Sequence, residues 1–125
     1  MRESSIQSNI LDTMGSLGIY GLRVNSGQFW GGEILSHMGD KLLLKNPTKI
    51  MGAAAGTSDV IGCKPTVITP EMVGKTFGRF VALEVKIPSK NAKKQQAIFL
   101  ANVRKWGGIA GVARSPEDAV MILNS

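Results

Sequence analysis

Cysteine, histidine and long apolar runs are scarce in this chain, and their scarcity narrows its possible functions. The only cysteine is Cys63 and the only histidine is His37. A single cysteine excludes an internal disulfide bond and a cysteine-rich zinc site. No apolar run approaches the length that crosses a membrane, and the N-terminal "MRESSIQSNI" lacks the apolar stretch of a signal peptide. We therefore expect a soluble, intracellular protein.

Acidic residues are also few. The chain has 9 Asp and Glu against 15 Lys and Arg, which gives a formal net charge of +6. This excess of positive charge favours an anionic partner, most often nucleic acid. A length of 125 residues is near the commonest domain size, and 43% hydrophobic residues suffice for a buried core. No linker, repeat or low-complexity tract divides the sequence, so we expect a single domain over residues 1–125.

The first half of the sequence predicts one helix followed by strands. Ser4 and Gln7 have the spacing of a capping box, so we expect a helix to begin near Ser4. Its apolar stripe comprises Ile6, Ile10, Leu11, Met14 and Leu17. Next, "GIYGLRVNSG" predicts a strand that closes in a turn at 25–27. "EILSHMGDKLLLKNP" predicts a hairpin with its turn near 38–40 and its second arm ending at 46–47, and "GTSDVIGCKPTVITP" predicts two short strands around 62–65.

The second half predicts a strand over 79–86, a helix over 91–106, a strand at "IAGVA" and a last helix. Ser115 would cap the last helix, with Pro116 in its first turn. The apolar stripe of the helix over 91–106 comprises Phe99, Leu100, Val103 and Trp106. The order of these elements predicts a mixed α/β (α+β) fold in which helices flank a central mixed β-sheet.

The strand "FVALEVK" ends with an acid and a base. Residues two apart on a strand project from the same face, so Glu84 and Lys86 are expected side by side. Val81, Leu83 and Val85 would fill the opposite face as ordinary core. The Glu84–Lys86 pair has two explanations, a structural ion pair or the working end of an active site.

Asp59 precedes the apolar Val60-Ile61, which places it at the start of a strand. A turn or capping role is the ordinary explanation for an acid there. The ordered set "GTSDVIG", "FVALEVK" and "QQAIFLANVRKWGG" nevertheless resembles the VRR-NUC family of the PD-(D/E)XK nuclease superfamily, especially its small stand-alone, phage-type members. "RVNSG" ahead of Asp59 and an acid at Glu3 add to the resemblance, which runs from Glu3 to about Ala119. Ser58 stands where the family often has Pro.

The resemblance implies a PD-(D/E)XK nuclease-like core and a Mg²⁺ or Mn²⁺ ion. It implies three ligands for that ion: the carboxylates of Asp59 and Glu84 and the backbone carbonyl of Val85. Hard oxygen ligands of this kind suit Mg²⁺. Glu3 would be a further catalytic acid behind these ligands, or a ligand through water. Lys86 would orient the attacking water and stabilise developing negative charge, because neighbouring carboxylates favour its charged form.

Further polar residues are expected to serve catalysis or DNA binding. Gln96 shares the apolar face of its helix and needs an inward partner, which an active site would provide. Gln95 competes for this role, but the spacing to the paired glycines favours Gln96. Cations gathered at a helix start oppose the helix dipole, which is easier to understand if phosphate binds there. The expected DNA-binding residues are Arg23, Ser26, Lys64, Lys90, Lys93 and Lys94.

Together these features predict a metal-dependent, structure-selective DNA endonuclease similar to a Holliday-junction resolvase. The alternatives are a flap or nicking endonuclease, a catalytically idle DNA-binding module on the same fold, and a basic structural protein. Two symmetric cuts across a junction require two sites, so we expect a homodimer, with Phe29 or Trp30 near its interface. The same aromatics could equally cap the core. The family's viral distribution implies a phage or prophage protein that acts in the cytoplasm of a bacterial host.

Overall fold

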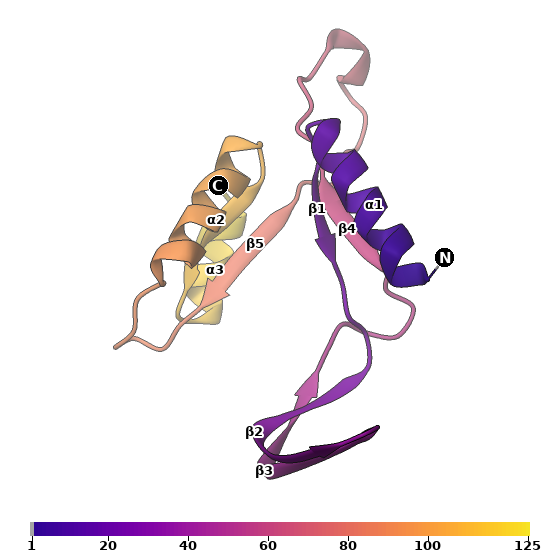
Figure 1. The fold of residues 1–125 in the computed structure, drawn as a ribbon. Coiled ribbons are helices and arrows are strands. Elements are labelled where there is room, and N and C mark those ends of the chain that lie inside the picture. The colour runs from indigo at the N-terminus through magenta and orange to yellow at the C-terminus, as the bar shows by residue number, and fades with distance from the viewer. Residues whose placement is uncertain (1) are drawn as a thin grey trace. The chain divides into compact units, whose positions relative to one another are not determined.

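The computed structural model describes residues 2–125, and their contacts divide the chain into two compact units, residues 1–62 and residues 63–125. Within the described residues there are three α-helices and three two-stranded sheets (Figure 1). The predicted mixed α/β class is therefore confirmed, but small separate sheets stand in place of one central sheet. No helix in residues 2–125 is long and apolar enough to cross a membrane.

Helix α1 (Glu3–Ser16) lies along strand β1 (Tyr20–Arg23) in the first unit, and β1 pairs with β4 (Val60–Cys63) (Figure 1). The close approach depends on Gly62. A Cβ atom at this position would meet the carbonyl oxygen of Tyr20 and the side chain of Met14. The absence of a side chain at Gly62 thus lets α1 and β1 approach β4, the strand that follows Asp59.

The start of α1 differs from the prediction. Glu3 is already helical, and Arg2 occupies the N-cap position without a side-chain hydrogen bond. Ser4 lies inside the first turn, where its carbonyl oxygen accepts a hydrogen bond from the Ser8 hydroxyl at 3.0 Å. The predicted Ser4–Gln7 capping box is therefore wrong. A negatively charged side chain in the first turn interacts favourably with the positive end of the helix dipole. Glu3 therefore stabilises the start of α1.

Strands β2 (Gln28–Met38) and β3 (Lys41–Met51) form a long antiparallel hairpin whose turn lies at residues 39–40, as predicted. The second arm does not end at Asn46-Pro47. The ladder shifts register between Gly31 and Glu33, and Asn46 has a positive φ of 48°. This irregularity accommodates Pro47, which has no N–H for the ladder, and the strand continues beyond it.

Only one of the two strands predicted around residues 62–65 exists, and it is β4. The β-branched run after Pro65 favours a strand by propensity, but Val67 and Ile68 are 85% and 77% exposed and pair with no strand of the described chain. A short 3₁₀ helix, Pro70–Met72, follows instead. Propensity alone does not make a strand where no neighbouring strand supplies hydrogen bonds.

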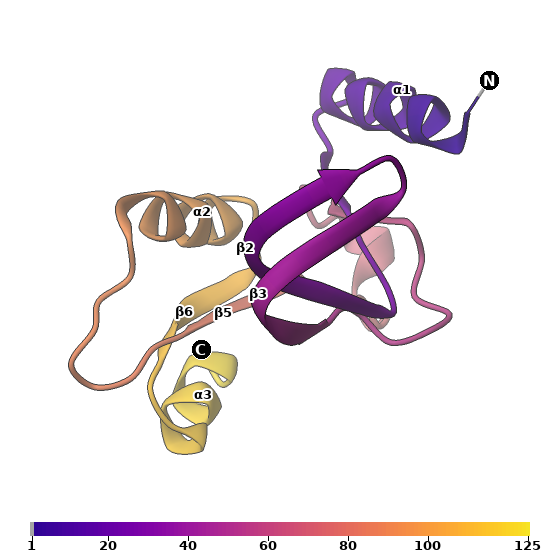
Figure 2. The ribbon, with the colours of Figure 1, turned by 60° about the horizontal axis from the view of Figure 1, so that its bottom comes forward.

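The second unit is a parallel strand pair covered by a helix on each face. Strand β5 (Val81–Val85) pairs with β6 (Ile109–Ala113), and α2 (Lys94–Lys105) connects them (Figure 2). Helix α2 packs on one face and α3 (Pro116–Leu123) on the other. The predicted α2 stripe is confirmed, since Leu100 and Val103 are buried.

The predicted boundaries of this unit are partly confirmed. Gly107 follows α2 with a positive φ of 92°, a conformation that favours glycine at a helix end. At the start of α3, the Ser115 hydroxyl accepts a hydrogen bond from the Asp118 N–H at 3.1 Å, which confirms the predicted cap. Strand β5 is shorter than predicted, and its second face is not ordinary core. Val81 and Val85 are 44% and 75% exposed, because β5 is an edge strand and α3 packs against β6.

Candidate active site

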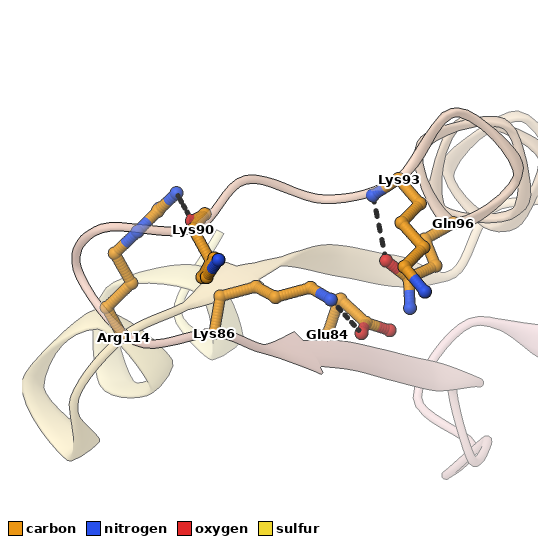
Figure 3. Close-up of polar contacts among 6 residues, drawn as sticks. All are labelled: Glu84, Lys86, Lys90, Lys93, Gln96 and Arg114. Carbon is orange, nitrogen blue, oxygen red and sulfur yellow. Dashed lines mark hydrogen bonds and ion pairs between the residues drawn. The ribbon is translucent and has the colours of Figure 1, made fainter.

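The C-terminal end of β5 brings an acid and a base into contact. Lys86 Nζ lies 3.5 Å from Glu84 Oε1, and their side chains are 17% and 28% exposed. Both side chains lie between β5 and the segment that leads to α2 (Figure 3). The strand end is fixed because the Lys86 N–H donates to the Ala113 carbonyl at 3.2 Å. The prediction that Glu84 and Lys86 lie on the same face is confirmed. A half-buried pair of this kind can be a structural ion pair or part of an active site.

The carbonyl of Val85 faces the free edge of β5. Along a strand, the backbone polar groups of successive residues point to opposite edges. The Lys86 N–H and the Phe80 carbonyl both bond to β6, so the even-numbered residues of this strand face β6 and Val85 faces away. Within residues 2–125, β5 pairs with β6 alone. The Val85 carbonyl therefore has no ladder partner there and is available as a ligand beside the Glu84 carboxylate.

Gln96 lies at the start of α2, on the side of β5 that carries Glu84 and Lys86 (Figure 3). Its Oε1 accepts a hydrogen bond from the Lys93 N–H at 2.8 Å. Gln96 is half-buried and Gln95 is exposed. Because the amide oxygen is engaged at the helix start, the NH₂ group remains to donate to a carboxylate, water or phosphate oxygen.

Glu3 and Asp59 line one cleft in the first unit. The cleft has a volume of about 340 Å³ and is lined by Glu3, Ile6, Gln7, Ile10, Asp59 and Val60. Asp59 is held at the start of β4 because its carbonyl accepts a hydrogen bond from the Val24 N–H at 2.8 Å. The structure thus brings two of the predicted catalytic acids to the same cleft, although they are far apart in sequence.

The remaining predicted catalytic acid, Glu84, lies in the second unit, so each unit holds a part of the predicted ligand set. Within residues 2–125, no three His, Cys, Asp or Glu side chains gather in a group that could hold a metal ion. The ligand set expected from the sequence has two carboxylates and one carbonyl, and it does not require such a group. Its oxygen donors have the chemistry that Mg²⁺ prefers, and no strand in the described part of the chain competes for the Val85 carbonyl.

A comparison with models of protein families identifies the family of this chain. The model of the VRR-NUC domain matches residues 1–117 of the 125-residue chain, across both units. The chain is a member of the VRR-NUC family. The resemblance to the VRR-NUC family that the sequence motifs predicted is thereby confirmed. No curated protein and no solved structure matches the sequence.

Membership in the VRR-NUC family implies a nuclease of the PD-(D/E)XK type with a DNA substrate. PD-(D/E)XK nucleases generally use divalent metals, which fits the oxygen donors at Asp59, Glu84 and Val85. The specific roles of these residues, and of Glu3, Lys86 and Gln96, remain predictions.

The predicted DNA-binding side chains of this VRR-NUC protein are all solvent-exposed. Lys90, Lys93 and Lys94 surround the start of α2, whose first turn contains no acid. In the first unit, Arg23 Nη2 donates to the Ser8 hydroxyl at 3.0 Å, and Ser26 lies in the turn after β1, where it forms a bridge to Ala53. The set also contains Lys64, which lines a cavity of about 300 Å³ in the second unit.

Two polar residues beside the candidate site were missed by the sequence interpretation. Gln7 lines the cleft with Glu3 and Asp59, and its spacing of four from Glu3 on one helix was the signal. Arg114 contacts the segment between β5 and α2. No local sequence pattern indicates this contact, because its partners are more than twenty residues away.

Proposed function

We propose that this VRR-NUC protein is a divalent-metal-dependent endonuclease that cuts branched DNA, in the manner of a Holliday-junction resolvase. The main support for this proposal is the arrangement of polar groups at the end of β5. At the end of β5, the Glu84 carboxylate, the Val85 carbonyl and the Lys86 ammonium follow one another in sequence, with Lys86 Nζ 3.5 Å from Glu84 Oε1. Among the described residues, no strand pairs with the edge of β5 that the Val85 carbonyl faces. Two oxygen donors and a cation at one strand end suit phosphodiester hydrolysis.

The metal would be held by Asp59, Glu84 and the Val85 carbonyl, with Mg²⁺ or Mn²⁺ as the ion. Bound there, the ion would supply a deprotonated water and compensate charge on the phosphoryl oxygens. Asp59 contributes from the cleft that it shares with Glu3. Glu3 would then act from that cleft as a catalytic acid behind the ligands, or bind the metal through a water.

Lys86 would act on the substrate. Its side chain is 17% exposed and lies beside a carboxylate, which holds the ammonium in place. A preorganised cation stabilises negative charge that develops on the phosphate without costly rearrangement. Gln96 would donate its free NH₂ group to the attacking water or to a phosphate oxygen, while Lys93 keeps its Oε1 engaged.

The proposed preference for four-way junctions depends on the protein forming a homodimer. One chain contains one Asp-Glu-Lys set, and two symmetric cuts require two sets in a fixed relation. The hairpin offers an interface, because Phe29 and Trp30 on β2 are 40% and 60% exposed. We propose a twofold homodimer with one of these aromatics near the interface. Light scattering at micromolar concentration tests this assembly, and a monomer that makes single nicks would favour a flap or nicking endonuclease.

Among the other functions, an idle DNA-binding module is the strongest competitor. It would retain the basic surface and lose catalytic side chains. All the expected catalytic positions carry suitable residues here: Glu3, Asp59, Glu84, Lys86 and Gln96. This favours an active enzyme. Phage or prophage origin, and action in the cytoplasm of a bacterial host, would accompany a small stand-alone nuclease of this kind.

A cleavage panel tests the proposed function. The purified protein is incubated with four-way, flapped and linear DNA of matched sequence, with Mg²⁺, Mn²⁺ or EDTA. We expect cleavage of the four-way DNA with paired cuts in either metal, and none in EDTA. Binding of all three DNAs without any cleavage in either metal would support the idle module and contradict the proposal.

A further inference from the structure

Arg114 connects the end of β6 to the segment that carries the basic residues. We define the β5–α2 connection as residues 86–93. Arg114 Nη2 donates to the Lys90 carbonyl at 2.9 Å (Figure 3). The same nitrogen donates to Asn91 Oδ1 at 3.2 Å. Both acceptors lie in the β5–α2 connection, which runs from Lys86 to the residue before α2.

Arg114 is itself held by the start of α3. Its N–H donates to Asp118 Oδ2 at 2.8 Å, and the Asp118 N–H donates to the Ser115 hydroxyl at 3.1 Å. The preceding residue, Ala113, accepts the hydrogen bond from the Lys86 N–H. One end of the contact is therefore fixed to β6 and α3, and the other end holds a segment with little structure of its own.

The β5–α2 connection needs such a contact. It contains Pro88, and its one internal backbone hydrogen bond among the described residues is Lys90 N–H to the Ile87 carbonyl at 3.0 Å. At its far end, the Lys93 N–H bonds to Gln96. Movement of the connection would displace Lys90 and Lys93 and alter the start of α2, where Gln96 lies.

We propose that Arg114 is a positioning residue for the cleavage reaction: its guanidinium clamps the β5–α2 connection to β6 and so fixes Lys90, Lys93 and Gln96 relative to Glu84 and Lys86. This inference rests on the proposed function. The two acceptors of Arg114 are neutral oxygens about 3 Å away, and both accept from the same nitrogen, Nη2, whose two N–H bonds have fixed directions in the plane of the guanidinium. A lysine ammonium carries the same charge, but its N–H bonds rotate on a flexible stem and have no fixed plane.

The alternative role is a direct phosphate contact, since the guanidinium has no carboxylate partner within residues 2–125. A phosphate contact depends on charge, whereas a clamp depends on the shape of the guanidinium. Arg114→Lys keeps the charge and removes the planar guanidinium, and Arg114→Gln removes both. The two variants therefore separate the roles.

The matched control is Arg79→Gln. The Arg79 guanidinium also donates two hydrogen bonds, to the backbone carbonyls of Gly107 at 3.3 Å and Ser125 at 3.4 Å, but Arg79 precedes β5 and lies at the opposite end of the strand pair. Its loss removes a cation and two similar hydrogen bonds from the same unit. It leaves the β5–α2 connection untouched.

The experiment measures amide hydrogen exchange of Lys90 and Lys93 by NMR, together with single-turnover cleavage and DNA affinity at several salt concentrations. We expect the amide hydrogens of Lys90 and Lys93 to exchange faster in both Arg114 variants than in the wild type. The amides in the buried turn of α2 should stay protected. The cleavage rate of both variants should fall by about ten- to a hundredfold, because a small displacement of catalytic groups lowers the reaction rate strongly. Arg114→Lys should keep the salt dependence of DNA binding, and Arg79→Gln should match wild type in exchange and rate.

Two results would overturn the inference. If Arg114→Lys matches wild type in exchange and cleavage while Arg114→Gln does not, charge rather than the clamp is the cause. If neither variant changes exchange at Lys90 and Lys93, Arg114 does not hold the connection. A wild-type protein that cuts no DNA would instead refute the proposed function, so the two failures are distinguishable.

Discussion

Replacing Lys86 with alanine separates the two roles that this side chain can have. In the structural role, Lys86 only neutralises Glu84, and its loss affects the folded state. In the catalytic role, it stabilises charge that develops on the phosphate, and its loss affects the reaction rate. The geometry of the pair gives a magnitude for each role.

For the structural role, the Coulomb attraction of unit charges 3.5 Å apart is about 5 kcal/mol at an effective dielectric constant of about 20. The side chains are 17% and 28% exposed, so desolvation and ordering costs offset most of this attraction. Because both side chains still reach solvent, the net contribution of the pair is about 1 kcal/mol, the upper end of the range for exposed pairs. Lys86→Ala should therefore lower the melting temperature by only a few degrees, roughly 3–6 °C.

For the catalytic role, removing one preorganised charge-stabilising group typically costs about 2.7–4 kcal/mol, a factor of roughly a hundred to a thousand in rate. Metal affinity should change little, because the ammonium is not a ligand. Single-turnover cleavage at saturating Mg²⁺ measures the rate, and thermal unfolding measures stability. Lys75→Ala is the control, since Lys75 is exposed in a loop of the same unit. If the cleavage rate of Lys86→Ala falls by tenfold or less, Lys86 serves only as the partner of Glu84 in a structural ion pair.

Two further predictions concern the start of α2. Gln96→Ala should slow cleavage more than Gln95→Ala, because Gln96 is half-buried on the side of Glu84 and Gln95 is exposed; the reverse order in single-turnover assays would show that the other glutamine serves the site. Phosphate contacts by basic side chains release condensed counterions, so removing such contacts should flatten the plot of log affinity against log salt. The variant for this measurement replaces three lysines together, Lys90, Lys93 and Lys94, and an unchanged slope would place the DNA-binding surface elsewhere.

Local signals in the sequence predicted the second unit well. The α2 stripe, the helix end at Gly107 and the cap at Ser115 each depend on residues within a few positions of one another. The adjacency of Glu84 and Lys86 follows from the two-residue period of a strand. These features are present as predicted, with 3.5 Å between the charged groups.

Features that depend on distant partners could not be predicted in this way. Pro47 suggested the end of a strand, but an irregular hairpin ladder accommodates it. The run after Pro65 has strand propensity but no neighbouring strand to pair with. The exposure of Val85 follows from the helix α3 packing on β6, and the Arg114 contact links residues far apart in sequence. Such outcomes are decided by tertiary packing rather than by local preference.

The central claim is that Asp59 and Glu84 together serve a metal that enables phosphodiester cleavage. Its most direct test is single-turnover cleavage of a four-way junction in Mg²⁺ by wild type, Asp59→Ala and Glu84→Ala, with DNA affinity measured in parallel. We expect both variants to lose cleavage and to bind the junction at least as tightly as wild type, because negative charge leaves the site while the basic surface remains. If either variant cuts the junction at the wild-type rate, that carboxylate is not part of the active site and the claim is contradicted.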